Sequence, residues 1–166
     1  MEIRPGDTRD VSVLLDFFDE AVEWMVSRGN TEQWGTEPWS AQPRRVERIG
    51  RMAADGELWI AEVDGEPAGA LIVSDRKMDY APPVDEPELY VVLLLVSRRH
   101  AGEKIGTTLL DHARDRAGSR GVGLMRVDCY AGGTGDLVRY YTRAGYTPTE
   151  TFSVGDWPGQ LFELRL

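Results

Sequence analysis

Basic side chains gather around one turn between an apolar segment and a helical one, in the stretch LLLVSRRHAGEKIGTTLLDHA. Arg98, Arg99 and Lys104 bring positive charge, and Gly102 and Gly106 let the backbone approach a ligand closely. A helix that begins where a strand ends also presents unpaired N–H groups and the positive end of its dipole. This combination suits a phosphate. The alternative is that the two glycines serve only a tight turn and close helix packing.

The rest of the chain is acidic, so an anionic ligand would need a local site of this kind. The 166 residues include 19 Lys and Arg against 28 Asp and Glu, for a formal net charge of −9. That balance argues against a nucleic acid or a membrane surface as partner. No apolar stretch reaches the length of a membrane span, and the first residues lack a signal-like apolar core. We therefore expect a cytoplasmic protein.

Cysteine and histidine are scarce. The single cysteine, Cys129, excludes an internal disulfide and any multi-cysteine zinc site, and only His100 and His112 could offer imidazole. We therefore expect no metal. Cys129 falls near the end of a predicted strand with no histidine placed to activate it, which favours a small buried hydrophobe over a nucleophile.

Apolar spacing predicts one domain over residues 1–166. Asp64-Gly65 between two apolar runs indicates a tight hairpin, and the unbroken run ELYVVLLLV indicates a strand covered on both faces. The order hairpin, strand, helix, strand, helix, strand predicts an α/β fold with a mixed sheet and helices on both faces. The predicted helices cover about residues 8–28, 43–54, 104–117 and 136–144, the third of them after a turn over residues 97–103. The predicted strands cover about residues 2–4, 58–63, 68–73, 88–96, 123–131, 146–154 and 160–166.

The run LYVVLLLVSRRHAGEKIGTTLLDHA resembles the acyl-CoA-binding segment of the GNAT superfamily of N-acetyltransferases. The signature of that segment, Gln/Arg-x-x-Gly-x-Gly/Ala, opens the helix after the fourth strand. Gly106 falls on its final glycine. Lys104 occupies the first glycine position and Ala101 the Gln/Arg position.

A second segment, DCYAGGTGDLVRYYTRAGYTPTETF, is similar to the later motif of the same family. Its helix ends Tyr141-x-x-x-Gly145-Tyr146, as the family motif does, and Gly133 stands where the family has Asn. The order of the elements also suits a GNAT protein over essentially the whole chain. The resemblance implies a mixed, mostly antiparallel central sheet of about six to seven strands with helices on both faces.

The resemblance implies transfer of an acetyl or other acyl group from acetyl-CoA to an amine, by direct attack in a ternary complex. The acceptor would be a small-molecule or peptide amine, and a homodimer stays open. In the family the fourth and fifth strands part and expose backbone groups that bind the pantetheine arm. The residues that the resemblance places at acetyl-CoA are Leu94, Leu95, Val96, Arg98, Arg99, Ala101, Gly102, Glu103, Lys104, Ile105, Gly106, Thr107, Gly133 and Tyr140.

Tyr141 is the candidate general acid that the resemblance implies. A phenol with a pKa near about 10 can protonate a thiolate whose conjugate acid has a pKa near about 8.5. The alternative is that Tyr141 only packs with its helical neighbours. Glu88 is the candidate base that takes the proton of the amine. The alternative is that Glu88 is a solvated charge at a strand end.

The acceptor site is expected opposite the cofactor groove, framed by the loop between the first two helices. Gln33, Trp34, Trp39 and Tyr90 are the candidate substrate contacts, because an aromatic wall accepts a cationic or flat ligand. Both tryptophans could instead anchor the loop to the core. Trp157 lies in a turn between the last strands, where it could cover the mouth of the site or an interface.

Two other functions stay open from the sequence. One is a catalytically silent acyl-CoA-binding domain with the same fold, suggested by Lys104 and Gly133 at signature positions. The other is an interaction module whose basic turn binds another protein.

Overall fold

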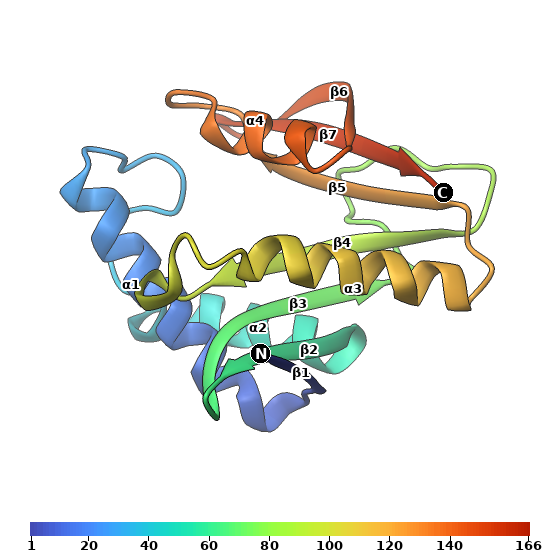
Figure 1. Ribbon diagram of the computed structural model, residues 1–166. Coiled ribbons are helices and arrows are strands. Elements are labelled where there is room, and N and C mark those ends of the chain that lie inside the picture. Colours follow the sequence, from blue (N-terminus) through green and yellow to red (C-terminus); the bar gives the residue numbers. More distant parts are fainter.

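A computed structural model describes residues 1–166 as a seven-stranded mixed sheet between two layers of helices (Figure 1). The strand order is β1-β2-β3-β4-β5-β7-β6. The strands are β1 (Glu2–Pro5), β2 (Glu57–Val63), β3 (Glu66–Ser74), β4 (Glu88–Val96), β5 (Leu124–Tyr130), β6 (Thr147–Val154) and β7 (Trp157–Arg165). The α-helices are α1 (Val11–Ser27), α2 (Pro43–Asp55), α3 (Ile105–Ser119) and α4 (Asp136–Arg143). Short 3-10 turns lie at Thr8–Asp10, Trp39–Ala41 and Arg98–His100.

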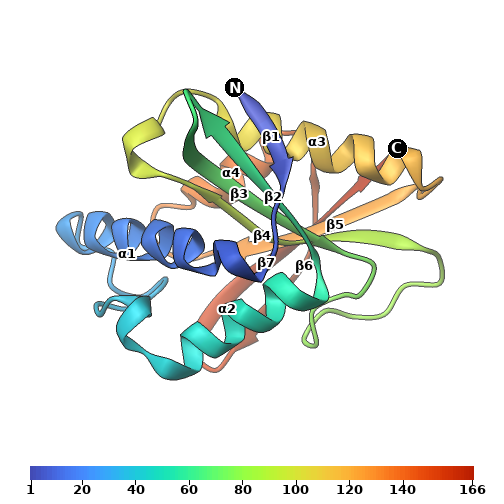
Figure 2. The same cartoon turned by 90° about the horizontal axis from the view of Figure 1, so that it is seen from below.

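The sheet confirms the predicted fold class. All neighbouring strands are antiparallel except β4 and β5, which run parallel and are joined through α3. Helices α1 and α2 cover one face, and α3 and α4 lie on the other (Figure 2). None of the helices is long and apolar enough to cross a membrane.

Each face of the sheet has its own apolar core. On the α3 side, Leu109, Ala113 and Ala117 pack against alternate residues of the central strands. On the other side, Phe18 and Val22 of α1 meet Ile49 of α2 over the opposite faces of β2 and β3. Because β3 and β4 contribute to both cores, their sequences are apolar almost without interruption, as expected for strands covered on two faces.

Local chemistry explains most of the element boundaries. Asp7 and Asp10 form a reciprocal capping box ahead of α1, and Pro43 occupies the first turn of α2, where its missing N–H costs nothing. Asp64 and Gly65 turn the β2–β3 hairpin with φ angles of 52° and 79°. The helix α3 begins at Ile105, directly after the predicted turn, and Lys104 at its N-cap is left-handed.

The centre of the sheet opens between β4 and β5. Their pairing begins at Glu88↔Leu124 and ends at Val91↔Val127. Figure 1 shows the two strands close together at one end and diverging towards α1. Val92 has no partner in β3, which marks a bulge at the point where the strands part, and a bulge increases local twist. The gap is therefore built into the pairing of the strands.

Candidate active site

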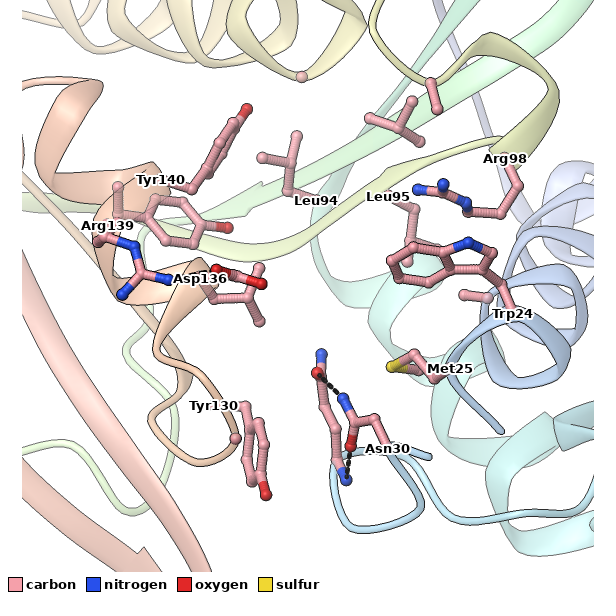
Figure 3. Close-up of a pocket in the computed structure, with 18 of the residues that line it drawn as sticks. Trp24, Met25, Asn30, Leu94, Leu95, Arg98, Tyr130, Asp136, Arg139 and Tyr140 are labelled. Atoms are coloured by element: carbon pink, nitrogen blue, oxygen red, sulfur yellow. Dashed lines mark hydrogen bonds and ion pairs between the residues drawn. The ribbon is translucent and has the colours of Figure 1, made fainter. Parts of the chain in front are cut away.

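A cavity of about 700 Å³ occupies the opening between the parted strands and the start of α3. This is within the range of about 300–1,000 Å³ usual for ligand sites. Its walls come from the end of α1, the ends of β4 and β5, the turn before α3, and α4. We call it the first cavity. Figure 3 shows Arg98 over Trp24 on one wall and Tyr140, Arg139 and Asp136 on the opposite wall.

The turn before α3 has the features of an anion site. Ile105, Gly106 and Thr107 form the first helical turn and line the first cavity. The first N–H groups of a helix have no intrahelical acceptor and carry the positive end of the dipole. Gly102 and Lys104, both left-handed with φ of 83° and 61°, set the direction of the chain into this turn. The backbone therefore presents donors to the cavity.

The structure around the start of α3 requires that residue 106 has no side chain. A Cβ atom at this position would collide with the hydroxyl of Tyr140 and touch Val96. Tyr140 itself comes from α4, on the far side of the strand gap. Gly106 and Tyr140 both line the first cavity, so α4 can approach the start of α3 at the cavity only because residue 106 has no side chain. The residues at this cavity therefore fit coenzyme A.

Two of the predicted cofactor contacts lie outside the first cavity. Arg98 faces the cavity with its guanidinium carbon 3.8 Å from the centre of the Trp24 ring. Arg99 turns away and pairs with Glu20, with its Nε atom 3.6 Å from a carboxylate oxygen. Glu103 contacts Nδ1 of His100 at 2.5 Å. The other predicted residues, Leu94, Leu95, Val96, Ala101, Gly102, Lys104, Ile105, Gly106, Thr107, Gly133 and Tyr140, line the cavity.

Lys104→Gly is expected to weaken the binding of CoA while stabilising the fold. A left-handed residue with a side chain costs about 1 kcal/mol or more, which glycine avoids, so Tm should rise by about 2–4 °C. Loss of the charge should raise the Kd for CoA about two- to fivefold, less at high salt. Calorimetry on Lys104→Ala is the control, because alanine loses the charge but keeps the strain. Tighter binding by Lys104→Gly would mean that the side chain narrows the turn.

The free edge of β4 borders the first cavity. Leu94, Leu95 and Val96 are hydrogen-bonded to β3 on one side, in register with Leu71, Ala70 and Gly69. The pairing of β4 with β5 has already ended, so the other edge has no strand partner. Backbone N–H and C=O groups along this edge are free to bind an amide-containing ligand in the manner of an added strand.

A second cavity, of about 400 Å³, lies on the side of the opening covered by α1 and α2. The first and second cavities share lining residues where the strands part, so they are adjacent. The shared residues are Gln33, Trp34, Leu94, Tyr130, Leu137 and Tyr141. A ligand in one cavity can therefore reach a ligand in the other at these side chains.

Tyr141 stands at this junction. The residue is 7% exposed, and its ring packs against Tyr140 and Phe162 in the α3-side core. The hydroxyl of Tyr141 makes no hydrogen bond within the protein. Only two fully buried side-chain atoms lack a hydrogen-bond partner, Nε2 of His112 and the hydroxyl of Tyr146. The hydroxyl of Tyr141 is therefore not fully buried. Burial raises the pKa of Tyr141 well above its usual value, so the hydroxyl keeps its proton. Tyr141 therefore packs with its helical neighbours and also lines both cavities.

Asp128 is a site residue that the sequence analysis missed. It lines the second cavity, and its carboxylate accepts hydrogen bonds from Tyr80 at 2.9 and 3.0 Å and from Tyr90. Burial raises its pKa, against the opposing effect of these hydrogen bonds and of the charge of Arg48. A charged residue inside an otherwise apolar strand segment, VDCY, was the signal that could have revealed it.

Some of the predicted acceptor residues line the second cavity, and others only support residues that line it. Gln33, Trp34 and Trp39 line the second cavity. Trp39 is also an anchor, because it stacks on Phe18 with ring centres 4.0 Å apart. Tyr90 lines neither cavity and reaches the site only through Asp128.

Trp157 and Cys129 also border the second cavity. Nε1 of Trp157 donates to the carbonyl of Gln33 at 2.8 Å, which ties the β6–β7 hairpin to the loop after α1. Burial raises the pKa of Cys129 to about 12, with a further contribution from Asp128. The residue is therefore a buried thiol, not a thiolate nucleophile.

Glu88 does not lie at the site. It is at the opposite end of β4, where its carboxylate accepts two hydrogen bonds from Arg126, at 2.7 and 2.9 Å. Both residues are buried, with 7% and 3% of their surfaces exposed, and neither lines a cavity. Glu88 and Tyr90 do lie on the same face of β4, but β4 and β5 are still paired at this end of the strand. The role of base therefore needs another residue.

Glu88→Gln is expected to destabilise the protein without changing the pH dependence of kcat/KM. Leaving Arg126 buried beside a neutral partner should lower the free energy of unfolding by about 3–5 kcal/mol, measured by urea denaturation. Glu47→Gln is the matched control, because Glu47 pairs with Arg51 on the surface and its loss should cost less than about 1 kcal/mol. Loss of the ascending limb in folded Glu88→Gln would restore Glu88 as the base.

Solved structures of several acetyltransferases share this fold. A GNAT-family acetyltransferase from Listeria monocytogenes superposes with a TM-score of 0.72 at 20% identity, covering 99% of this chain and 94% of that one. PaiA N-acetyltransferase from Thermoplasma acidophilum, solved with coenzyme A, gives 0.69 at 16% identity, covering 99% and 98%. The protein yncA from Salmonella typhimurium, solved with its cofactor acetyl-CoA, gives 0.64 at 19% identity, covering 99% and 92%.

The sequence comparison agrees with the fold. The model of the Acetyltransferase (GNAT) family matches residues 18–146, which include the whole turn before α3 and all of α4. A search of curated protein sequences found no significant match. The chain belongs to the GNAT acetyltransferase family.

Proposed function

We propose that this protein transfers the acetyl group of acetyl-CoA to an amine by direct attack, with the two substrates bound in adjacent cavities. The observation that carries the proposal is the position of Tyr141, which lines both cavities and whose hydroxyl makes no hydrogen bond and keeps its proton. The first cavity would hold acetyl-CoA and the second the amine. The single-step route needs no nucleophile from the protein, in keeping with the buried thiol of Cys129.

Acetyl-CoA supplies the acetyl group as a thioester. Transfer to an amine forms one N–C bond and breaks the C–S bond, whose electron pair stays on sulfur. The nitrogen loses one proton and the sulfur gains one. Tyr141 holds the proton for the sulfur. Asp128, on the acceptor side, is the carboxylate available to take the proton from nitrogen. Backbone groups on the free edge of β4 hold the reacting carbonyl in place.

The departures from the family signature do not favour the catalytically silent alternative. Lys104 and Gly133, which stand at signature positions, both adopt left-handed conformations, with φ of 61° and 63°. The path of the backbone at Lys104 is therefore one that glycine would also take. Gly106, where a side chain would collide with the hydroxyl of Tyr140, is retained.

Thermal denaturation with acetyl-CoA, followed by an acceptor screen that monitors free thiol, tests the proposal. A ligand at about 100 times its Kd adds about 2.7 kcal/mol of stability, or a rise in Tm of about 5–10 °C for a chain of this size. The proposal expects this rise and thiol release that depends on the amine. A rise without release would indicate a silent binder. No rise would indicate an interaction module.

A further inference from the structure

The second cavity carries more charge than the transfer of an acetyl group requires. Arg45 and Arg48 of α2 line it together with Asp128 of β5. Neither arginine forms an ion pair within the chain. We propose that the acceptor is an α-amino acid with an aromatic or large apolar side chain, bound by its carboxylate at Arg45 and Arg48 and by its amino group at Asp128. This proposal rests on the proposed function.

Arg45 is held in place but lacks an anionic partner. Its guanidinium lies over Trp39, with its carbon atom 4.0 Å from the ring centre, and its Nε donates to Gln42 at 3.0 Å. The two terminal nitrogens make no hydrogen bond to the chain. Burial lowers the pKa of Arg45, and the charge of nearby Arg48 lowers it further. Arg45 is thus held and partly buried, and Arg48, which is exposed on the same helix, adds a second guanidinium group at the cavity. Two guanidinium groups lining one cavity suit a carboxylate.

Asp128 gives the same cavity the opposite charge. Its carboxylate is fixed by Tyr80 and Tyr90, and the charge of Arg48 acts on it. Yet no ion pair joins Asp128 to Arg48 or Arg45, so opposite charges line one small cavity without neutralising each other. A ligand with both an ammonium and a carboxylate group would complete both halves of the site.

The remaining surface of the second cavity selects for an apolar side chain. Of its 22 lining residues, 18 are hydrophobic, and its volume of about 400 Å³ suits a single small molecule. Trp34, Trp39 and Trp157 provide large flat surfaces. An aromatic amino acid such as phenylalanine therefore matches the cavity in charge, size and apolar character.

Isothermal titration of the CoA-saturated protein tests this inference without depending on turnover. L-Phenylalanine is compared with phenethylamine, which lacks the carboxylate, and with phenylalaninamide, in which the carboxylate is neutral as in a peptide. We expect L-phenylalanine to bind about tenfold or more tightly than either, the size of effect given by a charge-assisted hydrogen bond. Phenylalaninamide or phenethylamine binding as tightly as L-phenylalanine would overturn the proposal, as would failure of all three to bind.

Arg48→Gln and Arg45→Gln test where the carboxylate binds. Each should reduce the preference for L-phenylalanine over phenethylamine to about twofold or less. Arg44→Gln is the control, because Arg44 is exposed on the same helix and lines neither cavity. Equal preference in Arg48→Gln, Arg45→Gln and wild type would refute the assignment. Binding of L-phenylalanine with no thiol release would keep this inference but contradict the proposed function.

Discussion

Tyr141→Phe is expected to lower kcat at least tenfold, and by up to about 10⁴-fold, while the Kd for CoA changes little. The substitution removes only the hydroxyl, which makes no hydrogen bond inside the protein. The ring keeps its contacts with Phe162 and Tyr140, so the core should stay packed. The measurement is single-turnover release of free thiol, which separates chemistry from product release.

Tyr146→Phe is the matched control for Tyr141→Phe. Tyr146 packs against Tyr141 in the same core, but its hydroxyl is enclosed without a partner and lines neither cavity. Its removal should leave kcat unchanged and raise stability slightly, because an unsatisfied buried hydroxyl is lost. Equal kcat in Tyr141→Phe and wild type would remove Tyr141 from the role of acid.

Asp128→Asn is expected to lower kcat/KM by about 10²-fold or more, because the carboxylate that takes the proton of the amine is lost. Burial raises the pKa of Asp128. The base is active when ionised, so kcat/KM of the wild type should rise with pH as Asp128 loses its proton. The variant should lack this rise. The same ascending limb in Asp128→Asn and in the wild type would exclude Asp128 as the base.

Tyr80→Phe is expected to shift the pH profile of kcat/KM in a known direction. The hydrogen bond from Tyr80 stabilises the ionised form of Asp128, as do the bond from Tyr90 and the charge of Arg48. Its loss should raise the pKa of Asp128 further and move the ascending limb of kcat/KM to higher pH. A limb that stays in place would show that another group sets it.

The free energy of unfolding of Asp128→Asn provides a second test. In the wild type, ionisation of Asp128 should raise kcat/KM but lower the stability of the fold. The pKa of Asp128 is higher in the folded than in the unfolded protein, so the folded state favours the protonated carboxyl. The free energy of unfolding should therefore fall as pH rises from the usual aspartate pKa through the raised one. The variant should lack this loss and be at least as stable as the wild type at neutral pH.

The sequence predicts the elements of this fold well because their boundaries have local causes. Asp7, Pro43 and the Asp64-Gly65 turn each act within a few residues of their position. At the start of α3, however, Lys104 takes a left-handed conformation that lysine rarely adopts. Nothing in the side chain of Lys104 signals that conformation.

The site was harder to predict, because it depends on where β4 and β5 stop pairing. Alternation along β4 gives Glu88 and Tyr90 the same facing, but it does not show that the gap opens only beyond Val91. Glu88 lies on the paired side of that point and Asp128 on the open side. The pairing of Glu88 with Arg126 joins residues 38 apart in sequence, and no local pattern reveals it.

The initial rate of thiol release, measured over a grid of acetyl-CoA and amine concentrations, tests the central claim most directly. Direct attack in a ternary complex predicts double-reciprocal lines that intersect, with no acetylated protein when acetyl-CoA is added alone. Parallel lines, together with an acetyl group recovered on Cys129, would contradict the account, because they would show a covalent route through the thiol that the structure keeps protonated.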